Sequence, residues 1–158
     1  MATSNSNASD PFATALRLLT GRDRSEAELS IKLRQLGFSA AEIEIAITKC
    51  RDYNYLNDQR YALERARALF RSGRGVGRKV QLDLRRRGID EATASQALEE
   101  ACCEFETTQI LREQLQRRFP TFDYLTADDK LKRRVVSHFQ RRGFALGEIF
   151  SVLKEEPE

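Results

Sequence analysis

Three glycines, Gly37, Gly88 and Gly143, each close an amphipathic stretch of sequence, and each is followed within two residues by the start of another. They lie 51 and 55 residues apart, a period typical of an array of helical units. Short helices cannot bury themselves, so such units must pack on one another. A repeat array presents an extended surface, which favours a binding protein over an enzyme.

Residues that begin helices recur around these glycines. Asp10–Pro11 is typical of a helix N-cap followed by proline at the first helical position. Ser25–Glu28 and Ser39–Glu42 each fit a capping box, in which the serine and the glutamate bond to each other's backbone amides. A weaker cap, Thr126–Asp129, precedes the middle helix of the third repeat.

Apolar residues at helical spacing predict which side chains face inward. Leu29 and Leu33 lie on one stripe of a helix that Gly37 ends. The equivalent inward positions in the other two repeats are Val80, Leu84, Val135 and Phe139. Over residues 91–119 the periodicity allows either one long helix or two helices with a break near Phe105.

We therefore predict an all-α protein of three tandem three-helix repeats that form an elongated, curved array. Residues 1–9 are expected to be a disordered leader, followed by repeats over residues 10–54, 55–105 and 106–158. The leader lacks the features of a signal peptide, and no apolar run approaches the roughly 18 residues that span a bilayer. Three cysteines, two of them adjacent, do not fit a disulfide framework. We expect a cytoplasmic monomer.

Catalytic and metal-binding chemistry has little support in the sequence. His138 is the only histidine, and its place beside an apolar stripe favours a half-buried structural residue. The glycine-rich segment 73–79 differs from a phosphate-binding loop, because Arg78 and Val80 stand where that loop needs a glycine and a hydroxyl. We interpret it as a connector, with Gly77 as a helix N-cap. No catalytic residue, metal or cofactor is expected.

The net charge is only +3, but the charges are unevenly distributed. Seven basic residues and one acid lie over residues 71–87, six acids without Lys or Arg over 90–106, and six basic residues without an acid over 130–142. Charge runs are usually solvated helix faces, but repetition at equivalent places favours a surface for a polyanion or an acidic protein. The residues predicted to form it are Arg71, Arg74, Arg78, Lys79, Arg85, Arg86, Arg87, Lys132, Arg133, Arg134, Arg141 and Arg142. Aromatic residues nearby are few, so contact with a nucleic-acid backbone is favoured over base stacking.

Two central motifs resemble a known family. Residues 55–62, YLNDQRYA, resemble the Y-L-[DN]-D-x-R-[FY]-A signature of the RecX family, and residues 71–89 resemble its R-x-x-G…L-x-x-[RK]-G-[IV] block. The resemblance extends from about Ala13 to Leu153. It implies three tandem three-helix units and a non-enzymatic bacterial regulator. Such a regulator binds the RecA recombinase and modulates, mainly by inhibition, its filament on single-stranded DNA.

Within the signature, four residues are expected to build the junction between repeats: Tyr55, Asp58, Arg60 and Tyr61. Tyr55 is expected to pack there, Asp58 to cap the next helix, and Arg60 to pair with Asp58 or with an acid of the neighbouring repeat. Two other functions stay open. The arginines could bind the phosphates of single- or double-stranded DNA without RecA, or the chain could be a helical adaptor for an acidic protein.

Overall fold

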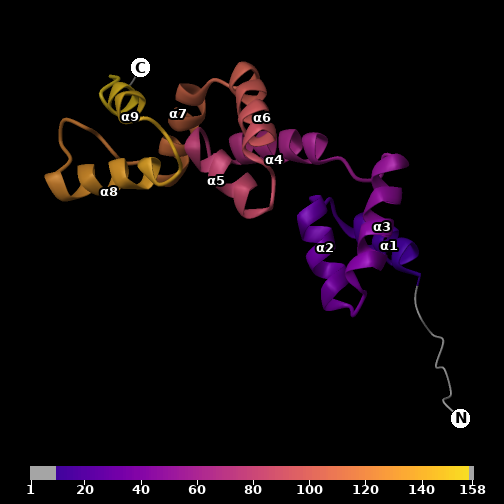
Figure 1. The fold of residues 1–158 in the computed structure, drawn as a ribbon. Coiled ribbons are helices and arrows are strands. Elements are labelled where there is room, and N and C mark those ends of the chain that lie inside the picture. The colour runs from indigo at the N-terminus through magenta and orange to yellow at the C-terminus, as the bar shows by residue number, and fades with distance from the viewer. Residues whose placement is uncertain (1–9, 157–158) are drawn as a thin grey trace, which may run out of the picture. The chain divides into compact units, whose positions relative to one another are not determined.

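The computed structural model describes residues 10–156, and that part of the chain contains nine α-helices and no strand (Figure 1). The all-α prediction is therefore confirmed, whereas the predicted leader 1–9 lies outside the described residues. The chain divides into two compact units. Unit 1 comprises the residues up to Tyr61 together with Arg87–Ile89, and unit 2 comprises Ala62–Arg86 and the residues from Asp90 onward. The elongated shape and the repeat boundaries stay predictions.

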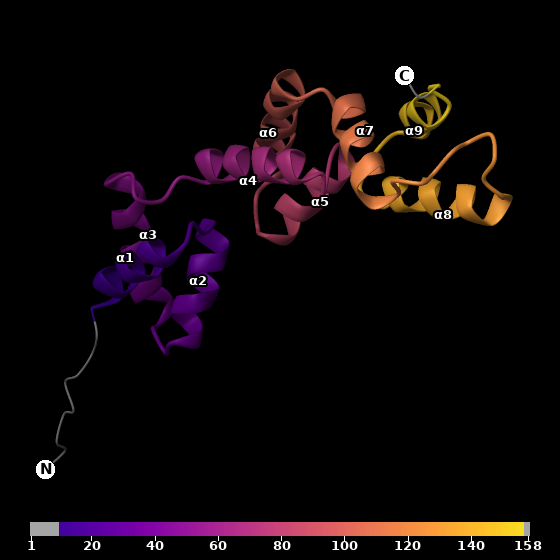
Figure 2. The ribbon, with the colours of Figure 1, turned by 180° about the vertical axis from the view of Figure 1, so that it is seen from behind.

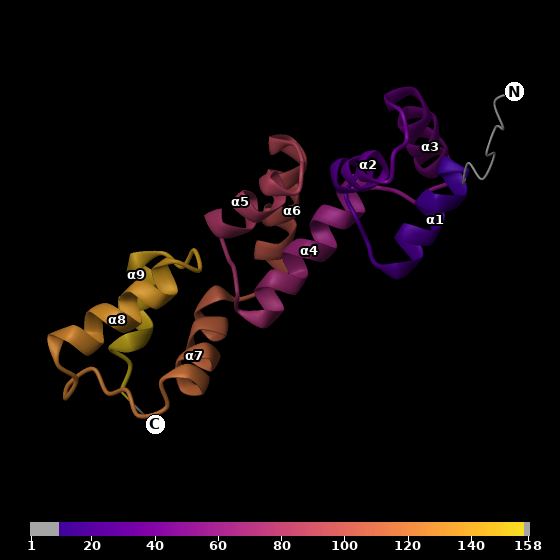
Figure 3. The same cartoon turned by 90° about the horizontal axis from the view of Figure 1, so that it is seen from below.

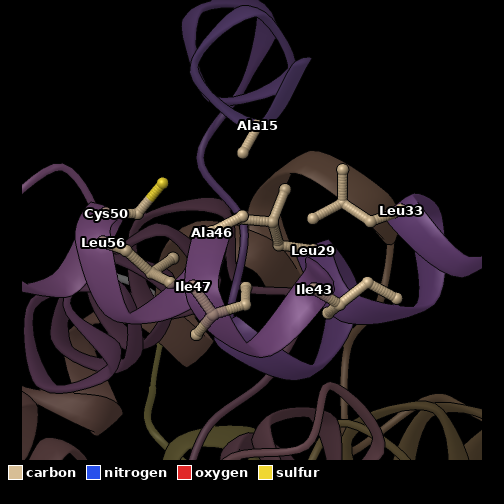
Figure 4. Packing of buried hydrophobic residues seen from close by; sticks show 8 residues of the cluster. All are labelled: Ala15, Leu29, Leu33, Ile43, Ala46, Ile47, Cys50 and Leu56. Atoms are coloured by element: carbon tan, nitrogen blue, oxygen red, sulfur yellow. The ribbon is translucent and has the colours of Figure 1, made fainter. Parts of the chain in front are cut away.

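Unit 1 is built on α1 (Pro11–Gly21), α2 (Glu26–Gln35) and α3 (Ala40–Asp52), which pack on one another (Figure 3). Figure 4 shows the buried side chains that these helices bring together. Leu29 and Leu33 of α2 are fully buried, as their spacing predicted. The rest of this core is Ala15, Ile43, Ala46, Ile47, Cys50 and Leu56. Burial raises the pKa of the Cys50 thiol.

The predicted helix ends of unit 1 are largely confirmed. Asp10 accepts a hydrogen bond from the Phe12 amide at 3.3 Å, and both bonds of the Ser39–Glu42 capping box form, at 2.8 and 3.2 Å. The Ser25–Glu28 box is only half formed. Ser25 accepts from the Glu28 amide at 3.1 Å, but the Glu28 carboxylate binds side chains elsewhere in unit 1.

Unit 2 begins within α4 (Asp58–Ser72) and continues through five further helices: α5 (Arg78–Arg86), α6 (Glu91–Glu104), α7 (Thr107–Arg118), α8 (Asp129–Gln140) and α9 (Leu146–Leu153). Helix α5 packs on α6, while α7 and α8 pack on α9. Arg67 of α4 forms two bonds with Glu104 of α6, at 2.8 and 2.6 Å. All four inward positions predicted for this unit, Val80, Leu84, Val135 and Phe139, are fully buried.

Two helix boundaries in unit 2 required the structure. The 91–119 segment breaks near Phe105, which is extended (φ −122°) and packs its ring 5.6 Å from that of Phe70. The Thr126 cap is wrong, because the N-cap of α8 is Asp128, which accepts from the Leu131 amide at 2.7 Å. Thr126 donates to Asp123 instead, at 3.1 Å.

The repeating glycines permit close packing as well as helix termination. Gly37, Gly88 and Gly143 all have positive φ, at 95°, 80° and 95°. A Cβ on Gly88 would lie 2.2 Å from that of Ala27, and one on Gly143 would lie 2.0 Å from the Val76 carbonyl oxygen. A Cβ on Gly37 would have no neighbour within 4 Å. The second and third glycines are therefore packing positions, whereas Gly37 serves the turn alone.

No helix among residues 10–156 combines the length and the apolar character needed to cross a bilayer. All three cysteines are free thiols. Cys102 and Cys103 of α6 are exposed.

Candidate functional site

The arginines of α5 project from a helix whose inward stripe is apolar. Val80 and Leu84 fill that stripe, and Arg78, Arg85 and Arg86 are exposed. The helix's acid, Asp83, is engaged by Arg65 of α4 through two bonds of 2.8 and 3.0 Å. The outward surface of α5 is therefore strongly basic.

Helix α8 has the same construction. Val135 and Phe139 are buried, while Arg133 and Arg134 are exposed on other faces. Arg141, just beyond the end of α8, is also exposed. Basic charge is therefore concentrated on two helices of unit 2 that each bury an apolar stripe.

Eight of the predicted site residues are exposed and form no salt bridge within residues 10–156. They are Arg71, Arg74, Arg78, Arg85, Arg86, Arg133, Arg134 and Arg141. Lys79 is partly buried, and Lys132 places its ammonium group 4.5 Å from the centre of the Tyr124 ring. Since exposed arginines without acids keep their hydrogen-bond donors available, this set can hold carboxylates or phosphates.

Arg87 differs from these residues, because it has an acidic partner within unit 1. Its guanidinium donates to Glu28 at 3.2 Å and to the Tyr61 hydroxyl at 3.2 Å. The Tyr61 hydroxyl in turn donates to Glu28 at 2.9 Å, and the buried Ser25 hydroxyl donates to the Arg87 carbonyl. These bonds bring residues of α2, α4 and the turn after α5 together.

Arg142 contacts the only histidine of the chain. Its Nη1 donates to the His138 carbonyl oxygen at 3.1 Å and lies 3.3 Å from His138 Nδ1. Burial, and then the charges of Arg142, Arg118, Arg141 and Arg134, lower the pKa of His138 to about 4. His138 is half-buried, as predicted.

Arg118 was missed by the sequence prediction. It ends α7, outside the basic segments that were singled out, but its charge lowers the pKa of both His138 and Arg142. The only local signal was the pair Arg117-Arg118 before Phe119.

The signature residues take roles that differ in part from those expected. Asp58 was expected to cap α4, but its carboxylate accepts from the Glu26 amide at 2.9 Å. The residue before it, Asn57, caps α4 instead and accepts from the Arg60 amide at 3.0 Å. Tyr55, for which packing was predicted, keeps 54% of its surface exposed.

Arg60, the remaining signature residue, donates to the Asn54 carbonyl at 3.3 Å.

No cluster of His, Cys, Asp and Glu suited to a metal ion occurs in the described part of the chain.

Comparison with known proteins gives matches along the whole array. Three RecX family models match in succession: the first three-helix domain over residues 12–50, the second over 57–98 and the third over 105–153. A protein named regulatory protein RecX from Syntrophotalea carbinolica is 46% identical over 93% of this chain and 96% of its own. One of the same name from Trichlorobacter lovleyi is 38% identical over 90% and 92% of the two chains.

Solved structures agree at the level of the fold. The crystal structure of RecX from Lactobacillus salivarius matches with a TM-score of 0.70 at 23% identity, covering 91% of this chain and 92% of that one. The consecutive domain matches and the two similar relatives together establish that the chain belongs to the RecX family of regulatory proteins.

Proposed function

We propose that the chain binds the RecA recombinase and restrains the assembly and activity of its filament on single-stranded DNA. Membership of the RecX family supports the partner, because the resemblance of the signature implies a regulator of RecA. The observation that carries the proposal is the set of exposed arginines on α5 and α8, which form no salt bridge within the described residues. Guanidinium groups bind carboxylates and phosphates bidentately, so a protein–DNA filament offers them ligands of both kinds.

The action is inferred to be binding and not catalysis. A general acid or base works best with a pKa near the operating pH. His138, with a pKa of about 4, is neutral at pH 7 and already in contact with Arg142 through Nδ1. This residue is therefore poorly suited to proton transfer.

The test is RecA's DNA-dependent ATPase activity, measured with the purified chain at substoichiometric amounts. We expect inhibition by the wild type, and at least about tenfold weaker inhibition by Arg85→Glu/Arg86→Glu and by Arg133→Glu/Arg134→Glu. The reason is that like charges across an interface cost several kcal/mol. The four side chains are exposed, so melting temperatures should change little.

A matched control reverses the same amount of charge in unit 1. Arg17 of α1 and Arg34 of α2 are exposed and form no salt bridge within residues 10–156, so Arg17→Glu/Arg34→Glu should inhibit like the wild type. The difference between variants should shrink with added salt, because charges are screened beyond roughly 8 Å at physiological ionic strength. Full inhibition by both unit 2 variants at low salt, with normal melting, would contradict the proposal.

A second candidate function is nucleic-acid binding without RecA. The same arginines favour it, since phosphates would supply the acidic partners they lack within the described residues. Affinity for bare DNA should then fall with salt, with a log–log slope of about −0.7 per phosphate contact on single strands. Tight binding to bare DNA without any change in RecA's ATPase activity would favour this function.

A further inference from the structure

The end of α8 carries a compact cluster of arginines around His138. Arg134 and His138 are four residues apart on one side of α8, and Arg142, four residues further on, lies in the turn just after the helix. Arg141 precedes Arg142 and is exposed. The bond from Arg142 Nη1 to the His138 carbonyl, at 3.1 Å, holds that guanidinium against the last turn of α8.

A second helix completes the cluster. The end of α8 lies beside the end of α7 (Figure 2), where the Phe119 ring meets the His138 ring edge-on at 5.2 Å and the Phe139 ring at 6.3 Å. Arg118 immediately precedes Phe119, and its charge is among those that lower the pKa of His138 and Arg142, so a fourth arginine lies near the cluster. The four arginines therefore come from the end of α7, from the next helix α8, and from the turn that follows α8.

No acid of the described residues neutralises this cluster. None of the four arginines forms a salt bridge there, and the charges that lower the pKa of His138 all come from Arg142, Arg118, Arg141 and Arg134. On the neighbouring α9, Glu148 accepts a hydrogen bond from Thr107; beyond that helix, Glu155 pairs with Arg112 at 2.7 Å. The fold thus maintains four cations around a neutral ring.

The number of cations favours a nucleic-acid backbone over a single carboxylate. One guanidinium fork pairs with a single carboxylate, whereas a nucleic-acid strand offers a negative charge at every nucleotide to four arginines without acids. Arg142 uses Nη1 for His138, and its Nη2 and Nε have no acceptor within the described residues. His138 positions this fork without adding charge of its own.

We propose that Arg118, Arg134, Arg141 and Arg142, arranged around His138, form a binding site for a phosphodiester group of a nucleic-acid backbone. The site adds Arg118 and a positioning role for His138 to the basic surface of unit 2. It rests on the function proposed above only in assigning that phosphate to the filament's DNA. The binding itself requires no RecA, so the two proposals can be tested separately.

His138 is a built-in reporter, because its ring signals in a nuclear magnetic resonance titration belong to the chain's one histidine. The experiment follows the pKa of His138 with and without a single-stranded oligothymidylate, in the absence of RecA. A phosphate at the site offsets the arginine charges, so the pKa should rise from about 4 toward the ordinary value of 6.5. A poly-glutamate peptide at equal charge should leave it near 4.

Two variants test the arginines. Arg118→Gln and Arg134→Gln should each raise the pKa of His138 without ligand, since each removes a nearby positive charge. Each should also weaken oligothymidylate binding about tenfold and make its log–log salt slope shallower by about 0.7. The control Arg17→Gln/Arg34→Gln, in unit 1, should leave the pKa of His138 unchanged.

The proposal is overturned if the oligonucleotide binds without moving the His138 signals. A rise in the pKa of His138 with poly-glutamate equal to that with oligothymidylate would instead assign the site to an acidic protein. If His138 stays unmoved while the wild-type chain still inhibits RecA's ATPase activity, the site fails and the proposed function stands. If the pKa of His138 rises with oligothymidylate but the chain does not inhibit RecA's ATPase activity, the binding site stands and the proposed function fails.

Discussion

Replacing Gly88 with alanine should destabilise unit 1 far more than the same change at Gly37. The two glycines occupy equivalent places after α5 and α2, both have positive φ, and both belong to unit 1. They differ in what a methyl group would meet. At Gly88 it would lie 2.2 Å from the Ala27 Cβ, whereas at Gly37 nothing lies within 4 Å.

The magnitudes follow from this difference. An alanine held in the left-handed region costs about 1–2 kcal/mol, which is the whole expected effect at Gly37. At Gly88, carbon atoms need about 3.5–4.0 Å, so residues 87–89 must shift, at an overpacking cost of about 1–3 kcal/mol. The shift also weakens the bond from Ser25 to the Arg87 carbonyl, which contributes about 0.5–1.5 kcal/mol. We therefore expect Gly88→Ala to cost about 3–6 kcal/mol.

Urea unfolding followed by far-ultraviolet circular dichroism measures both variants. A double variant, Gly88→Ala with Ala27→Gly, isolates the clash, because removing the Ala27 methyl makes room for the new one. A glycine inside α2 costs about 1 kcal/mol by itself, yet the pair should show a favourable coupling of about 1–3 kcal/mol. Equal costs for Gly37→Ala and Gly88→Ala, or no coupling with Ala27→Gly, would refute this reasoning.

Three further outcomes are expected. Leu33→Ala and Leu84→Ala should each lower the free energy of unfolding by about 2–5 kcal/mol in urea titrations, since both side chains are fully buried; losses below about 0.5 kcal/mol would contradict this. Glu28→Gln should cost about 1–3 kcal/mol, because the Arg87 guanidinium and the Tyr61 hydroxyl both bind that carboxylate in a partly buried site, and Tm measurements equal to wild type would count against it. His138 is harder to protonate in the folded state, so its contribution to stability is complete above pH 6.5 and is lost as pH falls toward 4. In the His138→Gln variant the free energy of unfolding should fall by about 1–3 kcal/mol less between pH 6.5 and pH 4 than in the wild type. The same pH profile for both proteins would exclude the effect.

Much of the fold could be predicted because its signals are local in sequence. The Ser39–Glu42 capping box and the buried stripe positions Leu33 and Leu84 follow from spacings of three or four residues. The errors arose where two capping residues lie close together. Asp128 competes with Thr126, and Asn57 with Asp58, and the backbone amide that each side chain reaches decides between them.

The candidate site could be predicted in composition but not in its pairings. Arg87 and Arg142 both precede a glycine and look alike in sequence. The structure gives Arg87 an acid, Glu28, from 59 residues away, and gives Arg142 a histidine four residues away. Arg118, next to the Phe119 ring that packs on His138, belongs to the second group through its charge. The Arg87–Glu28 and Phe119–His138 contacts depend on the folded chain, whereas the four-residue spacing of His138 and Arg142 is visible in the sequence.

The assignment of Arg87–Ile89 to unit 1 has a consequence for the order in which the protein is made. Synthesis runs from the N-terminus, and domains generally fold as units while the chain emerges. The Ser25 hydroxyl can donate to the Arg87 carbonyl only after 62 further residues are made, and Ala27 can pack on Gly88 only then. The residues of α4 and α5 are therefore synthesised before unit 1 gains its last contacts. A nascent chain that stops after α3 lacks the turn that closes its own first unit.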